Sequence, residues 1–267
     1  MEIDSSDLKD IDPGSFSPER PTRIDVRTPQ CVIPLLVVRR AEARRLVVLC
    51  NGAVDLARSG GEPVFQRSSW WSEIEAHQIY VCDPVTVGAD ALSLGWAQWS
   101  LQHWLVPEIA RACQHVYRAL GVAPDHERLY FGSSAGGFLA CGLVGLDPQA
   151  RAVVNNPQFD WTRWFPPAVN ALRNQRLDGL LPSVLRQEHA PRTNVLSFLA
   201  TQPELPSIEY WVNLMSAHDR DIQLAELDRA VEAHPRLRDS IHVRPYVDGE
   251  SKHNPLSKDE TLSLLNT

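Results

Sequence analysis

The chain has 267 residues, of which 43% are hydrophobic and 22% are charged, and its formal net charge is −7. This composition excludes a wholly disordered chain and allows one large domain with a sizeable buried core. The acidic balance provides no basic stripe of the kind that nucleic acids require, so no nucleic-acid partner is expected.

The first ten residues, MEIDSSDLKD, lack the basic and apolar regions of a secretory signal. No segment reaches the roughly 18 consecutive apolar residues that a membrane span needs. The cysteines form no C-x-x-C pair and are interpreted as small buried thiols in a reducing compartment. The chain is therefore predicted to be cytoplasmic, with its cysteines reduced at five positions: Cys31, Cys50, Cys82, Cys113 and Cys141.

Residues 1–30 are polar and contain four prolines, which predicts an irregular N-terminal arm or an edge hairpin before a domain over residues 31–267. Apolar runs of strand length then recur along the chain. Several are apolar on both faces, which is typical of a parallel sheet covered by helices. The expected strands are 32–38, 46–50, 79–82, 129–131, 152–154, 208–215 and 241–247.

Segments with helical periodicity separate these runs, at 99–120, 135–146, 224–233 and 258–265. Alternating strands and helices predict an α/β fold with an open, mostly parallel, doubly wound sheet. Residues 161–206 contain no convincing strand and are predicted to be helices inserted after a strand. An insertion there would lie over the carboxyl ends of the strands, where such sheets bind ligands, so it is interpreted as a substrate-shaping cap.

The strongest motif is Gly132-Ser133-Ser134-Ala135-Gly136, which follows an apolar strand and opens a helix. A serine on such a strand-to-helix turn is a nucleophile elbow. Glycines two positions before and after the serine allow the turn to close against its neighbours. We therefore predict that Ser134 is the nucleophile, and that Ser133 is a structural position.

A serine nucleophile requires a base, and in this type of site the chain order is serine, acid, histidine. Among nine histidines, His253 lies in a polar loop between the last expected strand and the last helix. The acid is expected after the preceding strand, where Asp219 fits best. Asp221 is the alternative, and Glu226 is a weaker one.

The oxyanion of the reaction needs backbone N–H donors. One is expected from Ala135, the residue after the nucleophile. A second is expected from Gly52 or Ala53, in the turn after the strand 46–50. The neighbouring Asn51 is a candidate substrate contact.

A second polar segment, 155–161, follows the strand 152–154 and is expected to line the substrate mouth. Asn156, Gln158 and Trp161, together with Trp164, suit a polar substrate with a stacking face, such as a sugar. The same residues suit a structural loop equally well.

At these motifs the chain resembles the α/β-hydrolase superfamily over roughly residues 32–265. The Gly-Ser-Ser-Ala-Gly-Gly segment, the later Asn156-Pro157-Gln158 and the segment 83–96 are also similar to hydrolases associated with bacterial surface-polysaccharide and glycoprotein export loci. That similarity implies a deacetylase or acyltransferase acting on a glycan. The chain departs from typical esterases at Asn51, where many of them have histidine.

The sequence therefore predicts a serine hydrolase of a carboxylic ester, acting on an O-acyl group of a sugar or small metabolite. An acyltransferase with the same triad is the near alternative, and a non-catalytic partner protein with this fold is the distant one. No metal-ligand spacing, phosphate loop or dinucleotide fingerprint occurs, so neither a metal nor a cofactor is predicted.

Overall fold

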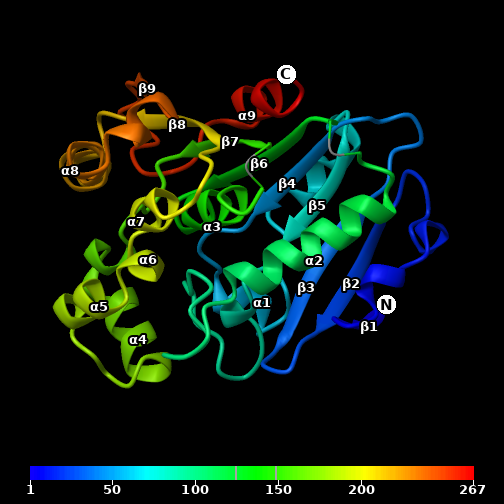
Figure 1. Cartoon of the computed structure of the whole chain (residues 1–267), viewed down its shortest axis with the longest axis horizontal. Coiled ribbons are helices and arrows are strands. Elements are labelled where there is room, and N and C mark those ends of the chain that lie inside the picture. Colours follow the sequence, from blue (N-terminus) through cyan, green and yellow to red (C-terminus); the bar gives the residue numbers. More distant parts are fainter. Residues whose placement is uncertain (124, 148) are drawn as a thin grey trace.

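A mixed sheet of nine strands organises residues 1–123, 125–147 and 149–267, which the computed structural model describes (Figure 1). Of the seven strands predicted from residue 32 onward, two have the predicted bounds and five differ by one or two residues at one or both ends, while two further strands lie within residues 1–30. The strands are β1 (Glu2–Asp4), β2 (Pro21–Arg27), β3 (Val32–Val38), β4 (Leu46–Cys50), β5 (His77–Val81), β6 (Arg128–Ser133), β7 (Arg151–Asn155), β8 (Ser207–Asn213) and β9 (Ile241–Tyr246).

The strand order is β1-β2-β3-β5-β4-β6-β7-β8-β9. From β5 to β9 every pairing is parallel, whereas β3 is antiparallel to both β2 and β5. Residues 1–30 contribute β1 and β2 to the edge of the sheet, and Leu8 and Phe16 from this segment are buried in the main core. This segment therefore packs as part of the sheet edge.

The order reverses at β4, because the chain passes from β4 to β5 on one side and then to β6 on the other. Open α/β sheets bind ligands at such a switch point, outside the carboxyl ends of the strands. The turn after β4 contains Asn51–Ala53 and the turn after β6 contains Ser134. The topology thus brings the predicted oxyanion loop and the predicted nucleophile together.

Helices cover both faces of the sheet, at the bounds α1 (Leu56–Ser59), α2 (Val106–Ala119), α3 (Ala135–Val144), α4 (Pro166–Arg176), α5 (Pro182–Glu188), α6 (Ala190–Thr193), α7 (Val195–Ala200), α8 (Ala225–Ala233) and α9 (Lys258–Leu265). The prediction that the second helix starts at residue 99 is wrong. It begins at Val106 with Pro107 in its first turn, where the missing N–H of proline costs no hydrogen bond.

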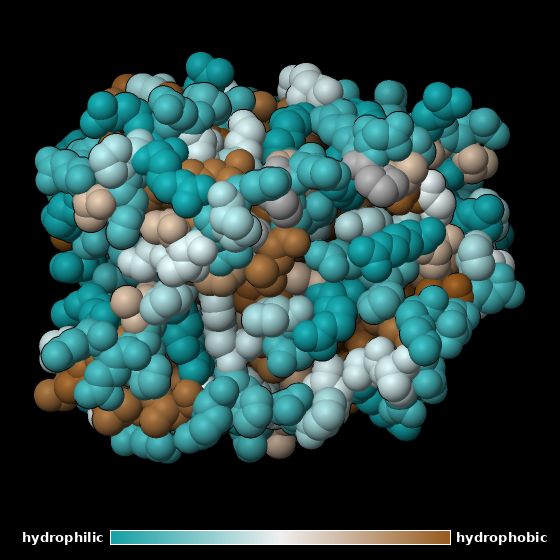
Figure 2. Space-filling model, viewed as in Figure 1, coloured by the Kyte–Doolittle hydropathy of each residue, from teal (hydrophilic) through white to brown (hydrophobic). Residues whose placement is uncertain are grey.

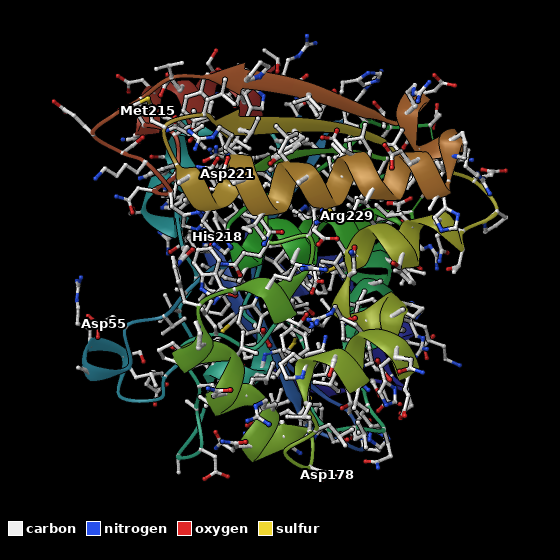
Figure 3. The ribbon with its side chains drawn as sticks, turned by 90° about the vertical axis from the view of Figure 1, so that its left-hand side faces the viewer. Asp55, Asp178, Met215, His218, Asp221 and Arg229 are labelled. Atoms are coloured by element: carbon white, nitrogen blue, oxygen red, sulfur yellow. The ribbon has the colours of Figure 1, made fainter. Side chains whose placement is uncertain are left out.

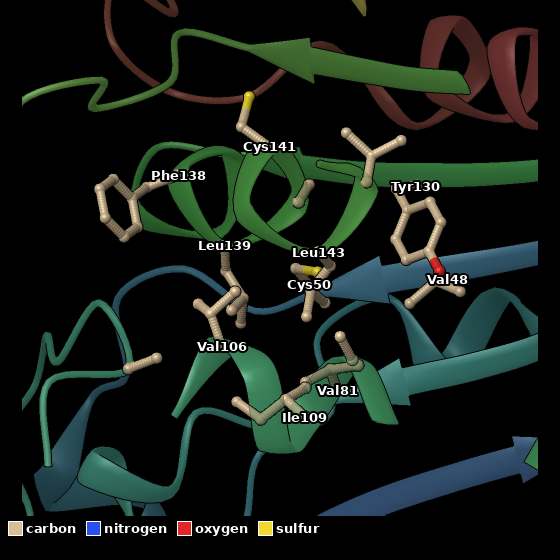
Figure 4. Close-up of a cluster of buried hydrophobic side chains, with 14 of the residues drawn as sticks. Val48, Cys50, Val81, Val106, Ile109, Tyr130, Phe138, Leu139, Cys141 and Leu143 are labelled. Atoms are coloured by element: carbon tan, nitrogen blue, oxygen red, sulfur yellow. The ribbon is translucent and has the colours of Figure 1, made fainter. Parts of the chain in front are cut away.

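Helix α3 is apolar all round because it packs on the sheet with α2 beside it, as the buried side chains of both helices in Figure 4 show, and with α7 in contact as well. Phe138, Leu139 and Leu143 are fully or almost fully buried there. The opposite face of the sheet is covered by α9, which contributes Leu265 to a second buried cluster with Val47 and Phe131. The nucleophile turn is therefore fixed between two packed layers.

Helices α4–α7 lie between β7 and β8 in the chain, and gather at one side of the sheet in Figure 1. The face in Figure 2 is mostly hydrophilic, with hydrophobic surface at the lower left, where Figure 1 places α4 and α5. Leu181, just before α5, is 59% exposed. Within the described ranges, no helix has the length and hydropathy to cross a membrane.

Candidate active site

Ser134 stands on a strained turn between β6 and α3, with φ 57° and ψ −125°. A side chain on Gly132 would collide with the backbone of Gly136. A Cβ on Gly136 would lie 2.6 Å from the carbonyl oxygen of Cys50. Both glycines are therefore required for the turn to pack against itself and against β4, which explains the G-x-S-x-G spacing.

His253 connects the serine to a carboxylate. Its Nε2 lies 2.9 Å from Ser134 Oγ, and its Nδ1 lies 2.8 and 2.9 Å from the two Asp219 oxygens. Asp219 is fully buried, whereas the His253 side chain is 27% exposed. A carboxylate facing Nδ1 holds the proton on that nitrogen, so Nε2 is left free to accept the serine proton. The structure brings the three predicted residues into one hydrogen-bonded chain.

The two alternative acids form ion pairs with arginines and do not contact His253 in the described structure. Asp221 is exposed and pairs with Arg220 at 2.6 and 2.8 Å. Glu226 pairs with Arg163 and Arg229. Figure 3 labels Asp221 at the start of the helical segment that continues into α8. Of the three carboxylates considered, Asp219 is therefore the one in contact with His253.

Three buried asparagines hold the loop that carries His253. Asn156 Nδ2 donates to the carbonyls of Lys252 and His253, and Asn213 Nδ2 donates to the carbonyls of Asp248 and Lys252. Asn155 Oδ1 accepts from the Leu256 amide. Asn156, predicted as a substrate contact, is completely buried in this role. Asn155 belongs to the segment that was expected to line the substrate mouth, and Asn213 was missed, although both end a strand.

Gln158 makes a contact that the sequence did not reveal. Its Nε2 donates to Ser134 Oγ at 2.8 Å, and its Oε1 accepts from the indole N–H of Trp96 at 2.6 Å. An indole nitrogen only donates, so the amide oxygen must face Trp96 and the amide nitrogen must face the serine. Gln158 is fully buried. It therefore contacts the nucleophile from the protein interior.

The predicted oxyanion donors differ in whether their backbone N–H groups already donate to an acceptor. In the ranges that the structure describes, the backbone N–H groups of Ala135 and Ala53 have no acceptor. The Gly52 amide instead donates to Gln66 Oε1 at 2.9 Å, while Gln66 Nε2 donates to the Ala53 carbonyl at 2.8 Å. Ala135 and Ala53 therefore have free donors, and Gly52 is engaged by a side chain.

Asn51 is buried and accepts a hydrogen bond from the Asp83 amide at 2.9 Å. Asp83 is also buried, which raises the pKa of its carboxyl, and it accepts from the Ala97 amide at 2.8 Å. Ala97 and Trp96 both have positive φ, so Asp83 stabilises the backbone that carries Trp96. Asn51 thus helps to position the backbone of Trp96 indirectly, through its hydrogen bond with the Asp83 amide.

Trp161 is completely buried, stacked on Trp96 with ring centroids 5.4 Å apart. Trp164 is partly exposed and lies 4.5 Å from the His253 ring, centroid to centroid. Phe165 and His218 continue this aromatic wall, and Phe165 is 53% exposed. Burial lowers the pKa of His218. Of the two tryptophans predicted to contact substrate, Trp164 is the one on the open side.

Among the residues that have described positions, no group of three or more His, Cys, Asp or Glu side chains could hold a metal ion. The arrangement can deliver a serine nucleophile, a histidine base and two amide donors to one carbonyl group.

No family model and no curated protein matches the sequence. Solved structures do match the fold. The capsule O-acetyltransferase of Neisseria meningitidis serogroup A superposes with a TM-score of 0.60 at 10% identity, over 91% of this chain and 94% of that one. A mutant of that enzyme has been solved in complex with CoA.

Porphyromonas gingivalis dipeptidyl peptidase 4 matches with a TM-score of 0.63 and 12% identity, over 94% of this chain and 36% of that one. EstE5 matches with a TM-score of 0.51 and 13% identity, over 98% and 86% of the two chains. At these identities the likeness shows the fold, which is that of the α/β-hydrolases. The predicted α/β-hydrolase fold is therefore confirmed.

Proposed function

We propose that this chain, which has the α/β-hydrolase fold, is a serine hydrolase of carboxylic esters that works through Ser134, His253 and Asp219. The observation that carries the proposal is the unbroken chain from Ser134 Oγ through His253 to both oxygens of Asp219, on a strained elbow at the switch point of the sheet. Such strain occurs chiefly at functional sites.

In the proposed reaction, Ser134 Oγ attacks the acyl carbonyl while His253 Nε2 takes its proton. The carbonyl oxygen becomes an oxyanion that accepts hydrogen bonds from the Ala135 and Ala53 amides. His253 then gives the proton to the departing alcohol, which leaves an acyl-enzyme. Water enters and attacks the acyl-enzyme while losing a proton to His253, and His253 returns that proton to Ser134 Oγ as the acid leaves. Asp219 stabilises the imidazolium in both halves.

The aromatic wall supports a ring-shaped alcohol on the substrate. Trp164 lies beside His253, and the neighbouring Phe165 is half exposed, so a sugar ring could stack there as its ester reaches Ser134. We propose an O-acylated sugar as the substrate class. Acyl transfer is the second candidate, because the fold likeness to a capsule O-acetyltransferase extends over 94% of that enzyme.

The test is labelling by a fluorophosphonate probe and turnover of 4-nitrophenyl acetate, butyrate and octanoate, compared with Ser134→Ala and His253→Ala. Hydrolysis is expected in the parent, and both variants should lose it. A folded parent that is neither labelled nor active would overturn the proposal. Acetyl-CoA with a hexose as acceptor separates the candidates, because an O-acetylated sugar as the main product would favour transfer.

A further inference from the structure

A two-residue segment, Gln66-Arg67, connects the two halves of the site. Gln66 holds the oxyanion loop through the Gly52 amide and the Ala53 carbonyl. Arg67 Nη2 donates to the hydroxyl of Ser133 at 2.9 Å, directly beside the nucleophile. Arg67 has φ 66°, a left-handed conformation that most residues avoid. The strain places the guanidinium beside the nucleophile elbow.

The Arg67 guanidinium has aromatic neighbours instead of a counter-ion. Its central carbon lies 5.0 Å from the Phe131 ring centroid and 5.8 Å from that of Trp70. Its Nε is buried without an acceptor, and among residues 1–123, 125–147 and 149–267 no carboxylate pairs with it. Burial lowers the pKa of this guanidinium to about 10, as expected for a cation removed from water.

Two other buried or partly buried arginines of the chain, Arg128 and Arg192, have more hydrogen-bond acceptors than Arg67. Arg128 forms two hydrogen bonds with Asp147, at 2.8 and 2.9 Å. Arg192 donates to Gln98 Oε1 and to the carbonyls of Leu101 and Ser100. Arg176 also has a buried Nε without an acceptor, but its Nη2 donates to the Asp90 carbonyl at 3.2 Å. Within the described residues, the Arg67 guanidinium has the neutral Ser133 hydroxyl as its hydrogen-bond acceptor, and leaving a charge unpaired is unfavourable.

Room for a ligand exists beside this segment. A cleft of about 440 Å³ is lined by Ala53, Gln66 and Arg58, among others. Asp55 also lines the cleft, but its carboxylate caps α1 by accepting from the Ala57 and Arg58 amides. Lys258 Nζ, which lies 6.0 Å from the Trp70 ring, is paired with Glu73 Oε1 at 2.7 Å. The cleft therefore adjoins the oxyanion loop, and Gln66 in its lining is the chain neighbour of Arg67.

We propose that Arg67 binds an anionic oxygen group of the substrate, a carboxylate or a phosphate, next to the ester that Ser134 attacks. This inference rests on the proposed ester chemistry and specifies the substrate class. The planar fork of a guanidinium matches two oxygens of such a group and supplies the counter-ion that the fold leaves out. A phosphorylated or acidic O-acyl sugar meets both this requirement and the stacking wall.

The kinetic test compares three acetate esters of one shape: 4-acetoxybenzamide, 4-acetoxybenzoate and 4-acetoxyphenyl phosphate. We expect the parent to favour an anionic ester over the neutral one by about tenfold or more in kcat/KM, which corresponds to about 1.4 kcal/mol. Arg67→Gln should bring that ratio close to one, and Arg67→Lys should keep part of it. Arg118→Gln, which removes an exposed charge on α2, is the matched control.

A parent that treats the neutral and anionic esters alike, or an Arg67→Gln variant that keeps the preference, would overturn the inference. The two anionic esters tell a carboxylate site from a phosphate site. If Arg67→Gln does not fold, Arg67→Lys replaces it, because a lysine keeps the charge but not the planar fork of donors. An anion preference in Arg67→Lys equal to that of the parent would then count against Arg67.

Binding separates this inference from the proposed function. Calorimetric titration of Ser134→Ala with benzoate, phenyl phosphate and benzamide requires no turnover. Anion binding that weakens about tenfold or more in Ser134→Ala/Arg67→Gln would support the anion site even if no ester were hydrolysed. Turnover of the neutral ester without any anion binding would support the hydrolase and refute the role of Arg67.

Discussion

Replacing Gln158 tests whether its side chain positions the nucleophile. In Gln158→Leu the 2.8 Å bond from Nε2 to Ser134 Oγ is lost, and the Trp96 indole N–H loses its acceptor. A hydrogen bond to a group that acquires charge contributes about 1.5–3 kcal/mol. Since 1.36 kcal/mol is tenfold in rate, kcat for 4-nitrophenyl butyrate should fall by about 10- to 150-fold.

The matched control is Gln78→Leu. Gln78 is also fully buried and also uses both ends of its amide, donating to the Trp71 carbonyl and accepting from Tyr80. It lies on β5, and none of the hydrogen bonds of its side chain in the described structure involves Ser134. Both variants should lose thermal stability, but only Gln158→Leu should lose kcat beyond about twofold, because only its amide contacts the nucleophile.

Gln158→Glu adds a readout that a purely structural role would not affect. Below the pKa of the introduced carboxyl, its O–H can donate to Ser134 Oγ. Above that pKa the carboxylate only accepts, and competes with His253 for the serine proton. The activity of the variant relative to the parent should therefore rise as pH falls. A ratio that is flat with pH, with kcat of Gln158→Leu within twofold of the parent, would show that Gln158 does not position the nucleophile.

Three further predictions concern the proposed acid Asp219, the buried His77 and the buried ion pair of Asp147 with Arg128. Asp219→Asn should lower kcat by about 10⁴-fold, whereas Asp221→Asn should change it by less than about twofold, because only Asp219 holds the base. Burial lowers the pKa of His77 below 6.5, so its contribution to stability is present above that pH and lost below it. The pH dependence of unfolding between about pH 7 and about pH 5 should therefore be shallower in His77→Gln. Asp147→Ala should lower the free energy of unfolding in urea by about 3–5 kcal/mol, because the buried Arg128 guanidinium loses the carboxylate that accepts two of its hydrogen bonds.

Each of these three predictions would be contradicted by one specific result. Equal loss of kcat in the two aspartate variants would remove the assignment of the acid. An unchanged pH slope in His77→Gln would mean that His77 titrates alike in the folded and unfolded chains. A loss below about 1 kcal/mol in Asp147→Ala would place the pair among weak surface ion pairs.

The nucleophile turn could be read from local sequence because its requirements are local. An apolar strand, two glycines around Ser134 and a helix of small residues are consecutive in the chain, and the backbone clashes at Gly132 and Gly136 follow from that spacing. The strands Val32–Val38 and Leu46–Cys50 were equally plain, since an apolar run bounded by polar residues marks both ends.

Tertiary structure alone decided which polar residues serve which part of the site. Gln158 and Trp96 are 62 residues apart, and Arg67 and Ser133 are 66 apart, so their contacts depend on how the loops fold over the sheet. The same holds for Asn156, whose amide faces inward to the His253 loop, because a side chain after a strand can point to either layer. Sequence thus determined the seven strands from β3 to β9 and the elbow, through periodicity and backbone sterics. The partners of the nucleophile were decided by long-range packing, because a buried polar group is satisfied by whichever element the fold brings beside it.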